Sequence, residues 1–312
     1  MGNEPDILPA YVNPNSRYGC WGNQDDQYYG GTYYAEMLKV VYPQIKAADP
    51  DAQVLIGGLL MDCDPNNPPV QSSGQPKDCQ PSYFLEGILE NGGGDYFDGI
   101  SFHAYDYYWI DGSKFINGWR AGLNGGLPVV YYKTAFLRAL LTQYGYPDKL
   151  LLNTETALLC GNDQGEAVCR TDEYHQTKAN YVAQSYAVAR GEYLQANVWY
   201  HYQEGWRASG LVQSPSNPYP ALSAYRFAAQ MLKDTIPLEF IQDYPNVVGY
   251  KFLKSTSEGL QEIWVLWAAD GVSSTIILPE LPNQLFDVLG QDLSPSQTLD
   301  ITTNVLYLVW NR

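Results

Sequence analysis

Between residues 33 and 233, short apolar segments alternate with longer amphipathic ones, and this alternation constrains the fold more than any other feature. The apolar segments have the length of strands (residues 54–59, 97–105, 150–158 and 196–202), and the amphipathic segments have the length of helices. Polar and aromatic residues gather at the end of each apolar segment. Strands that alternate with helices and end in polar clusters predict parallel βα units.

With residues 1–5 counted as a first short strand, the sequence predicts five parallel strands. After residue 237 the segments become short and extended, and turn signals such as 269–271 (ADG) separate them. We therefore predict an α/β domain over residues 1–234 and a small antiparallel β domain, of the sandwich type, over residues 235–312. The second domain is expected to support the first structurally.

The charge balance excludes two classes of partner. The chain of 312 residues carries 34 acidic and 18 basic residues, which gives a formal net charge of −16. Nucleic acids and anionic membranes are bound through Lys and Arg, so we expect neither as a partner. No apolar run approaches the roughly 18 residues of a membrane span, and the first residues lack the pattern of a signal peptide. The 27 Tyr and 8 Trp residues suit a site for sugar rings, although an ordinary aromatic core would use them as well.

Five cysteines are placed so that two pairs bracket loops. Cys63 and Cys79 enclose a loop rich in Pro, Asn and Gly, and Cys160 and Cys169 enclose a second loop rich in Gly and Asp. Local loop closure favours these two disulfides and leaves Cys20 unpaired. Two disulfides predict an extracellular or secreted protein, and the alternative is five reduced thiols in a cytosolic one. With three His and no CxxC spacing, we expect no metal site.

Two carboxylates stand out by their positions. The strand at 150–158 (LLLNTETAL) carries one charge, Glu155, in the half where α/β enzymes present catalytic groups. A second carboxylate, Glu4, lies in the first segment. A retaining glycosidase needs such a pair, about 5–5.5 Å apart: one group attacks the anomeric carbon, and the other stays protonated, donates to the leaving oxygen and later activates water. The alternatives are a helix cap or surface charge for Glu155 and a disordered chain end for Glu4.

Four strand ends, taken in order, resemble those of the clan A glycoside hydrolases, a superfamily of retaining (β/α)8-barrel glycosidases. Residues 3–5 (NEP) are similar to the motif that ends the fourth barrel strand. Residues 102–105 (FHAY) resemble the His-x-Tyr of the sixth strand, and 153–155 (NTE) resemble the seventh. Residues 198–199 (VW) match the eighth-strand Trp. The resemblance extends over nearly the whole chain, including a small β domain after the last helix.

This resemblance implies a role for each matching residue. Glu155 would be the nucleophile and Glu4 the general acid/base. Four further residues would bind or surround the sugar, namely Asn3, His103, Tyr105 and Trp199. By its position after the eighth strand, Glu204 is another candidate for substrate binding, with a merely solvated carboxylate as the alternative. No cofactor is implied.

The sequence departs from the superfamily at its start. Members have three βα units before the NEP motif, and none precedes it in this chain. The expected fold is therefore a partial TIM-type barrel of about five parallel βα units, corresponding to strands 4–8, plus the small β domain. Such a sheet exposes its edges, so we expect association, most simply as a homodimer. Coverage by another protein, coverage by the loops at 6–31 and 106–128, and truncation of a complete enzyme are the alternatives.

The predicted function is retaining hydrolysis of a β-linked polysaccharide or oligosaccharide. One alternative is a catalytically weak or inactive relative that binds carbohydrate, and a more distant one is a structural protein built on a half barrel. The presence of both Glu155 and Glu4 favours an active glycoside hydrolase, whereas the absence of the first three strands favours the inactive carbohydrate-binding relative.

Overall fold

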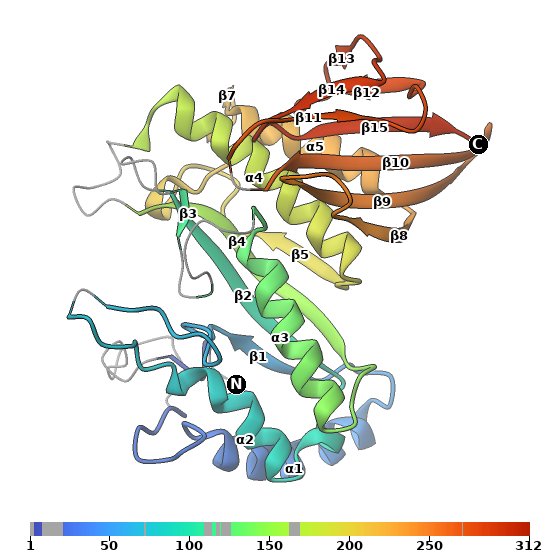
Figure 1. Cartoon of the computed structure of the whole chain (residues 1–312). Coiled ribbons are helices and arrows are strands. Elements are labelled where there is room, and N and C mark those ends of the chain that lie inside the picture. The colour runs from blue at the N-terminus through green and yellow to red at the C-terminus, as the bar shows by residue number, and fades with distance from the viewer. Residues whose placement is uncertain are drawn as a thin grey trace.

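The structure is a computed structural model that describes residues 3–7, 21–71, 73–108, 114–116, 119, 126–161, 169–269 and 271–312. The chain forms a parallel α/β part and then an antiparallel β part, which lies at the end of the molecule far from α1 and α2 (Figure 1). Cys20 and much of the two long loops lie outside the described residues.

A parallel sheet of four strands is the framework of the first part. The order of its strands in space is β1 (Leu55–Leu59), β2 (Gly99–Tyr108), β4 (Leu150–Cys160) and β5 (Ala196–Trp199). A short strand, β3 (Lys114–Ile116), pairs antiparallel with the end of β2. These four strands coincide with the four apolar segments of the sequence, because runs that are buried on both faces are typical of parallel strands.

The helices also follow the predicted segments. They are α1 (Gly31–Ala48), α2 (Phe84–Glu90), α3 (Val129–Gln143), α4 (Asp172–Gly191) and α5 (Pro220–Leu232). The start of α4 is fixed by its sequence: the Thr171 side chain accepts a hydrogen bond from the backbone N–H of Tyr174, and Asp172 and Glu173 lie in the first turn. Within the described residues, no helix is both long enough and apolar enough to cross a membrane.

The fifth predicted strand, at residues 1–5, is not a strand of this sheet in the described part of the chain. Asn3 makes only an isolated bridge, and Glu4 has a φ of 49°, which is left-handed backbone. The N–H of Ile7 then donates to the Glu4 carbonyl at 3.0 Å, which closes a turn. A left-handed residue followed by Pro5, which lacks an N–H, cannot continue a ladder.

The antiparallel part is a sheet of six strands that packs on the helices. Its order is β13 (Asp292–Leu293), β12 (Gln284–Phe286), β15 (Leu306–Asn311), β10 (Gly259–Ala268), β9 (Val247–Thr256) and β8 (Thr235–Ile241). One face contributes Tyr250, Phe252 and Trp267 to the main core. The other face forms a second core with the pair β11 (Ser274–Ile277) and β14 (Thr298–Ile301). The main core therefore crosses residue 234, and the domain boundary stays a prediction.

One extra residue in β4 changes which side chains face which layer. Phe102 of β2 pairs with Asn153, whereas the next residue, His103, pairs with Glu155. Thr154 is thus an insertion, and its hydroxyl donates to the Phe102 carbonyl at 3.4 Å. The pairing of β4 with β5 slips by one residue in the same stretch. Such a β-bulge re-aims the side chains that follow it.

Both predicted disulfides are confirmed. Cys63 is bonded to Cys79 with a Cα–Cα distance of 5.3 Å, and Cys160 is bonded to Cys169 with a Cα–Cα distance of 5.9 Å. The first closes the loop after β1, and the second closes the loop between β4 and α4. Both loops leave the carboxyl ends of parallel strands, which is the edge where α/β proteins place their sites.

Candidate active site

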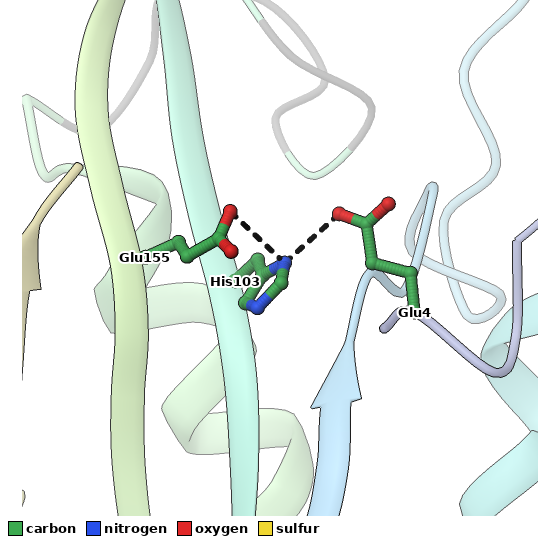
Figure 2. A group of neighbouring side chains, drawn as sticks. All are labelled: Glu4, His103 and Glu155. Atoms are coloured by element: carbon green, nitrogen blue, oxygen red, sulfur yellow. Dashed lines mark hydrogen bonds and ion pairs between the residues drawn. The ribbon is translucent and has the colours of Figure 1, made fainter. Parts of the chain in front are cut away.

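Glu4, His103 and Glu155 meet at the carboxyl ends of the parallel strands. The imidazole Nδ1 of His103 lies 2.8 Å from Oε1 of Glu4 and 3.5 Å from Oε2 of Glu155. Figure 2 shows the ring between the two carboxylates, with Glu155 on β4 and Glu4 on the segment beyond β1. One ligand-type atom from each residue lies within 4.8 Å of the other two. Residues 151 positions apart in sequence therefore form one compact cluster.

The bulge in β4 is what brings Glu155 into this cluster. Residues two apart on a regular strand face the same way, yet Asn153 and Glu155 do not. The Asn153 amide donates to Asn197 at 2.7 Å, and the Asn197 amide donates to Ser185 of α4 at 3.0 Å. Asn153 thus faces the helix layer. Because Thr154 is inserted between them, Glu155 instead faces the side of the sheet where His103 lies.

His103 fits only because β1 has a glycine beside it. The His103 side chain is 2% exposed, and a Cβ at Gly58 would lie 2.1 Å from its Nε2. A side chain at position 58 would therefore displace the ring. An ionised carboxylate can only accept, so Nδ1 carries the proton whenever Glu4 is ionised.

Tyr105, two residues after His103 on β2, is hydrogen-bonded to the carboxylate of Glu155. Its hydroxyl donates to Oε2 of Glu155. Burial, and after it the Glu155 carboxylate, raise the pKa of Tyr105 well above its ordinary value. The phenol therefore remains a donor at every physiological pH. A permanent donor on one oxygen of Glu155 fixes the orientation of the carboxylate.

Asp6 anchors the turn that carries Glu4. Its carboxylate is buried and accepts the backbone N–H groups of Leu60, at 2.8 Å, and Met61, at 2.7 Å. The Tyr29 hydroxyl adds a hydrogen bond to the Ile7 carbonyl at 2.9 Å. These contacts dock residues 4–7 on the segment that follows β1, so the position of Glu4 depends on them.

A buried lysine ties the same segment to His103. The ammonium group of Lys133, on α3, donates to the carbonyls of Leu60, at 2.5 Å, and His103, at 2.7 Å. Burial lowers the pKa of Lys133 to about 8. Leu60 therefore has both backbone groups held by buried ionisable side chains, Asp6 and Lys133. Sequence reasoning missed both residues, since neither belongs to a motif.

The burial of Asp6 predicts a pH dependence of stability. Burial raises its pKa from 3.8 to about 6, a difference worth about 3 kcal/mol. Because folding raises the pKa of this acid, its contribution to stability is complete below pH 3.8 and is lost as the pH rises through about 6. We therefore expect the free energy of unfolding of Asp6→Asn, relative to that of wild type, to increase by about 2–3 kcal/mol when the pH is raised from 4 to 7. Urea unfolding of both proteins at the two pH values measures this difference.

Asp49→Asn is the matched control for this experiment. Asp49 also accepts a backbone N–H, from Asp51 at 3.0 Å, but it lies exposed at the end of α1. The difference in free energy of unfolding between Asp49→Asn and wild type should be nearly the same at pH 4 and at pH 7. If Asp6→Asn behaves like this control, Asp6 is not held in a buried, protonation-sensitive state.

Two exposed aromatic residues that the motifs did not reveal lie beside Tyr105. The ring centroids of Tyr200 and Trp206 are 5.7 and 5.8 Å from that of Tyr105, and Trp206 is 47% exposed. Trp206 is followed by two residues with left-handed backbone, Arg207 (φ 52°) and Ala208 (φ 55°). Strain of this kind in non-glycine residues is typical of functional sites. An exposed Trp beside a candidate catalytic carboxylate suits the apolar face of a sugar ring.

Two of the predicted sugar-binding residues have different surroundings. Asn3 is half-buried next to Glu4. Trp199 is buried, its indole N–H donates to the Ser209 carbonyl at 2.9 Å, and its ring lies edge-on to Tyr181 of α4. These contacts place Trp199 in the core on the helix side, so the structure does not bring it to the cluster.

Glu204 belongs to a separate group of side chains near the start of α5. It accepts a hydrogen bond from the Tyr219 hydroxyl at 2.6 Å and lies 3.8 Å from Arg170. The ring of His175 stacks on Tyr219 with centroids 3.9 Å apart. Burial lowers the pKa of His175 to about 4. The substrate-binding role of Glu204 stays a prediction.

The cluster could also be considered as a cation site. Two carboxylates and an imidazole with atoms within 4.8 Å of one another are ligands that can bind a divalent metal ion. These three residues already take part in hydrogen bonds: His103 is bonded to Glu4, and Glu155 accepts a hydrogen bond from Tyr105. Such bonds are what a pair of proton-transferring carboxyl groups requires without a metal.

Comparison with solved structures identifies the class of fold. No protein-family model and no curated protein matches the sequence. Two solved structures that resemble the chain are a glycoside hydrolase and a glucosidase, and the chain has the fold of a glycoside hydrolase. The predicted resemblance to this superfamily is thereby confirmed at the level of the fold.

Two of these structures can be named. A family 39 glycoside hydrolase from the gut symbiont Bacteroides cellulosilyticus WH2 superposes with a TM-score of 0.62 at 22% identity, over 94% of this chain and 57% of that one. A glucosidase from Croceicoccus marinus superposes with a TM-score of 0.56 at 13% identity, over the whole of this chain and 68% of that one. The chain thus spans little more than half the length of the first.

Proposed function

We propose that the protein is a retaining glycoside hydrolase that acts on a β-linked polysaccharide or oligosaccharide. The observation that carries the proposal is the meeting of Glu4 and Glu155 on either side of one imidazole nitrogen, with an oxygen of each within 4.8 Å. This separation suits the about 5–5.5 Å of retaining enzymes better than the about 6.5–9.5 Å of inverting ones. The glycosidase fold supports the same class of reaction.

In the proposed reaction, Glu155 attacks the anomeric carbon with the oxygen that does not bind Tyr105. The bond to the leaving oxygen breaks as Glu4 gives that oxygen its proton, and a glycosyl ester forms on Glu155. Glu4, now ionised, takes a proton from water, whose oxygen attacks the same carbon and frees Glu155. His103, hydrogen-bonded to Glu4 at 2.8 Å, would hold that carboxyl group in position through both proton transfers.

The stereochemistry of the first product tests this proposal. The protein is incubated with a panel of nitrophenyl β-glycosides, and the anomer formed first is read by proton NMR before mutarotation. We expect the β-anomer to appear first. An α-anomer would exclude the double displacement, and hydrolysis that disappears with EDTA would point instead to a cation at the Glu4–His103–Glu155 cluster.

A second candidate is a carbohydrate-binding relative without turnover. The exposed rings of Tyr200 and Trp206 beside Tyr105 favour it, because aromatic faces bind sugars whether or not a reaction follows. Calorimetric titration with oligosaccharides separates the two candidates. Binding without any product from the glycoside panel supports the binding protein.

We also infer an oxidising, extracellular setting and association of two copies. The two disulfides support the first inference. In the described part of the chain, β1 and β5 are the outer strands of the parallel sheet, and an exposed strand edge favours pairing with another chain. Light scattering at micromolar concentration should then give twice the mass of one chain. A single-chain mass would exclude the homodimer.

A further inference from the structure

A small pocket lies beside the candidate catalytic cluster, and two of its lining residues are hydrogen-bonded to residues of that cluster. It has a volume of about 210 Å³ and is lined by Leu60, Asp62, Lys77, Tyr105, Tyr107, Trp119, Val129 and Lys133. Tyr105 also binds Glu155, and Lys133 also binds the His103 carbonyl. The pocket therefore borders the cluster.

The size of the pocket suits one sugar ring. Its volume corresponds to about seven water molecules at about 30 Å³ each. It is smaller than the about 300–1,000 Å³ of sites for drug-sized ligands. The walls combine the aromatic residues Tyr105, Tyr107 and Trp119 with charged groups, which is the mixture that a ring with apolar faces and polar edges requires.

An ion pair in the wall provides both a donor and an acceptor. Nζ of Lys77 lies 2.6 Å from Oδ2 of Asp62, and both side chains are partly exposed. Oδ2 of Asp62 is itself buried against this ammonium group. Because the rest of both side chains is partly exposed, a hydroxyl can approach the Asp62 carboxylate to donate and the Lys77 ammonium group to accept. Since the two charges cancel, the pair suits a neutral hydroxylated ring better than a charged ligand.

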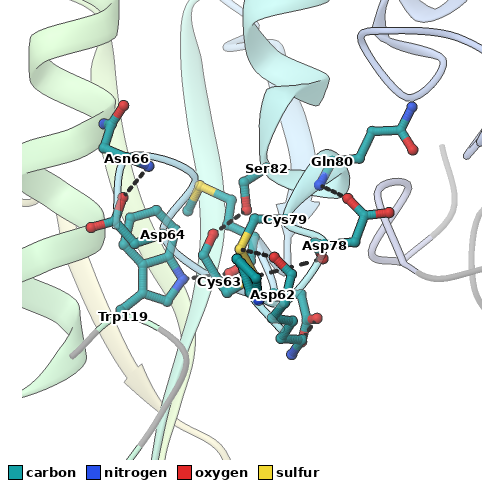
Figure 3. Close-up of a disulfide and its surroundings, with 12 residues drawn as sticks. Asp62, Cys63, Asp64, Asn66, Asp78, Cys79, Gln80, Ser82 and Trp119 are labelled. Atoms are coloured by element: carbon teal, nitrogen blue, oxygen red, sulfur yellow. Dashed lines mark hydrogen bonds and ion pairs between the residues drawn. A yellow bond between two sulfur atoms is a disulfide. The ribbon is translucent and has the colours of Figure 1, made fainter. Parts of the chain in front are cut away.

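A disulfide holds this ion pair in place. Asp62 precedes Cys63, and Lys77 lies two residues before Cys79, so the Cys63–Cys79 bond joins the two ends of the loop that carry the pair. Figure 3 shows Asp62 and Trp119 beside this disulfide. The indole N–H of Trp119 donates to the Met61 carbonyl at 2.6 Å, which fixes another wall to the same segment.

The order of the strands tells on which side of the reacting bond the pocket lies. Glu4, the candidate proton donor, is docked on Leu60 and Met61 through Asp6, and Leu60 also lines the pocket. Tyr200 and Trp206 follow β5, at the opposite end of the sheet. A proton donor stands next to the leaving oxygen. The pocket is therefore on the side of the leaving group.

The geometry points to a binding subsite for the leaving sugar: the pocket binds the neutral ring whose oxygen Glu4 protonates, through the Asp62–Lys77 pair and its aromatic walls. This inference rests on the proposed glycosidase function. It adds that the substrate is an oligosaccharide or polysaccharide with a sugar, and not an apolar aglycone, on the leaving side.

Substitution of the ion pair tests the subsite. Lys77→Met and Asp62→Asn are compared with wild type on cellotriose, laminaritriose or xylotriose, whichever wild type cleaves, and on the matching nitrophenyl monosaccharide. We expect kcat/KM on the trisaccharide to fall at least about tenfold, as for loss of a hydrogen bond to a charged group. On the nitrophenyl substrate, whose leaving group has no sugar hydroxyls, kcat/KM should change less than about twofold. Equal losses on both substrates, or no loss, would overturn the subsite.

Lys39→Met is the matched control, because Lys39 makes an exposed ion pair with Glu36 on α1 at 2.7 Å. It should leave both substrates unaffected. If wild type cleaves no glycoside, the proposed function fails. Calorimetric titration with the same trisaccharides then still tests whether the pocket binds a sugar. Affinity lost in Lys77→Met and Asp62→Asn but kept in Lys39→Met supports a sugar site. Affinity unchanged in all three, or no binding by wild type, overturns it.

Discussion

Replacement of Glu155 by Gln or Ala should lower kcat for glycoside hydrolysis by at least about 10³-fold, because no other group can form the covalent intermediate. The hydrogen bond from Tyr105 and the packing of β4 remain in Glu155→Gln, so the fold should be unaffected. Steady-state kinetics on nitrophenyl β-glycosides give the loss, and circular dichroism checks the fold.

Azide distinguishes a lost nucleophile from general damage. In Glu155→Ala the anion can enter the space of the missing carboxylate and attack the anomeric carbon, while Glu4 still protonates the leaving oxygen. We expect turnover to return and an α-glycosyl azide to form. Glu239→Gln, on the distant strand β8, serves as the control and should keep full activity. Undiminished hydrolysis by Glu155→Gln would remove this residue from the mechanism.

Replacement of Glu4 by Gln should give a loss that depends on the leaving group. General acid catalysis contributes about 10²–10⁴-fold, so hydrolysis of oligosaccharides and alkyl glycosides should fall by that factor. Nitrophenolate leaves without a proton, so formation of the glycosyl ester from nitrophenyl glycosides should be nearly normal. The second step then becomes limiting, since Glu4 no longer activates water, and a burst of nitrophenol should precede slow turnover.

The two glutamates are told apart by the product of the azide reaction. In Glu4→Ala, azide attacks the anomeric carbon of the glycosyl ester without needing a base, the bond to the Glu155 oxygen breaks, and a β-glycosyl azide is expected. This anomer is the opposite of the one expected from Glu155→Ala. Stopped-flow measurement of the burst and NMR of the azide product check both points. Equal losses on all leaving groups would argue that Glu4 acts only through the structure of its turn.

The sequence predicted the four parallel strands and the disulfides because each depends on local information. Apolar runs define strands, and paired cysteines bracket their own loops. The cluster itself depended on the motifs at Glu4, His103 and Glu155, which the structure brings together. Tyr200 and Trp206 could not be found in this way, because their approach to Tyr105 depends on how the chain turns after β5.

Other misses have a similar physical origin. The position of Trp199 was inferred from its place at a strand end, but the face on which a side chain lies depends on register with the neighbouring strand. Asp6 and Lys133 bind backbone groups and not other motif residues, so no spacing in the sequence connects them. The left-handed backbone at Glu4 falls on a residue type that seldom adopts it, so no glycine or asparagine marks the turn in the sequence.

The bulge at Thr154 decides which side chains of β4 face the candidate catalytic cluster. Residues two apart on a regular strand face the same side, so without the bulge Asn153 and Glu155 would either both face the helices or both face His103. Two proteins with the same residues at this strand end could thus differ completely in activity. When this strand is compared with others, its pairing with the neighbouring strand β2 is as informative as the identity of Asn153 and Glu155.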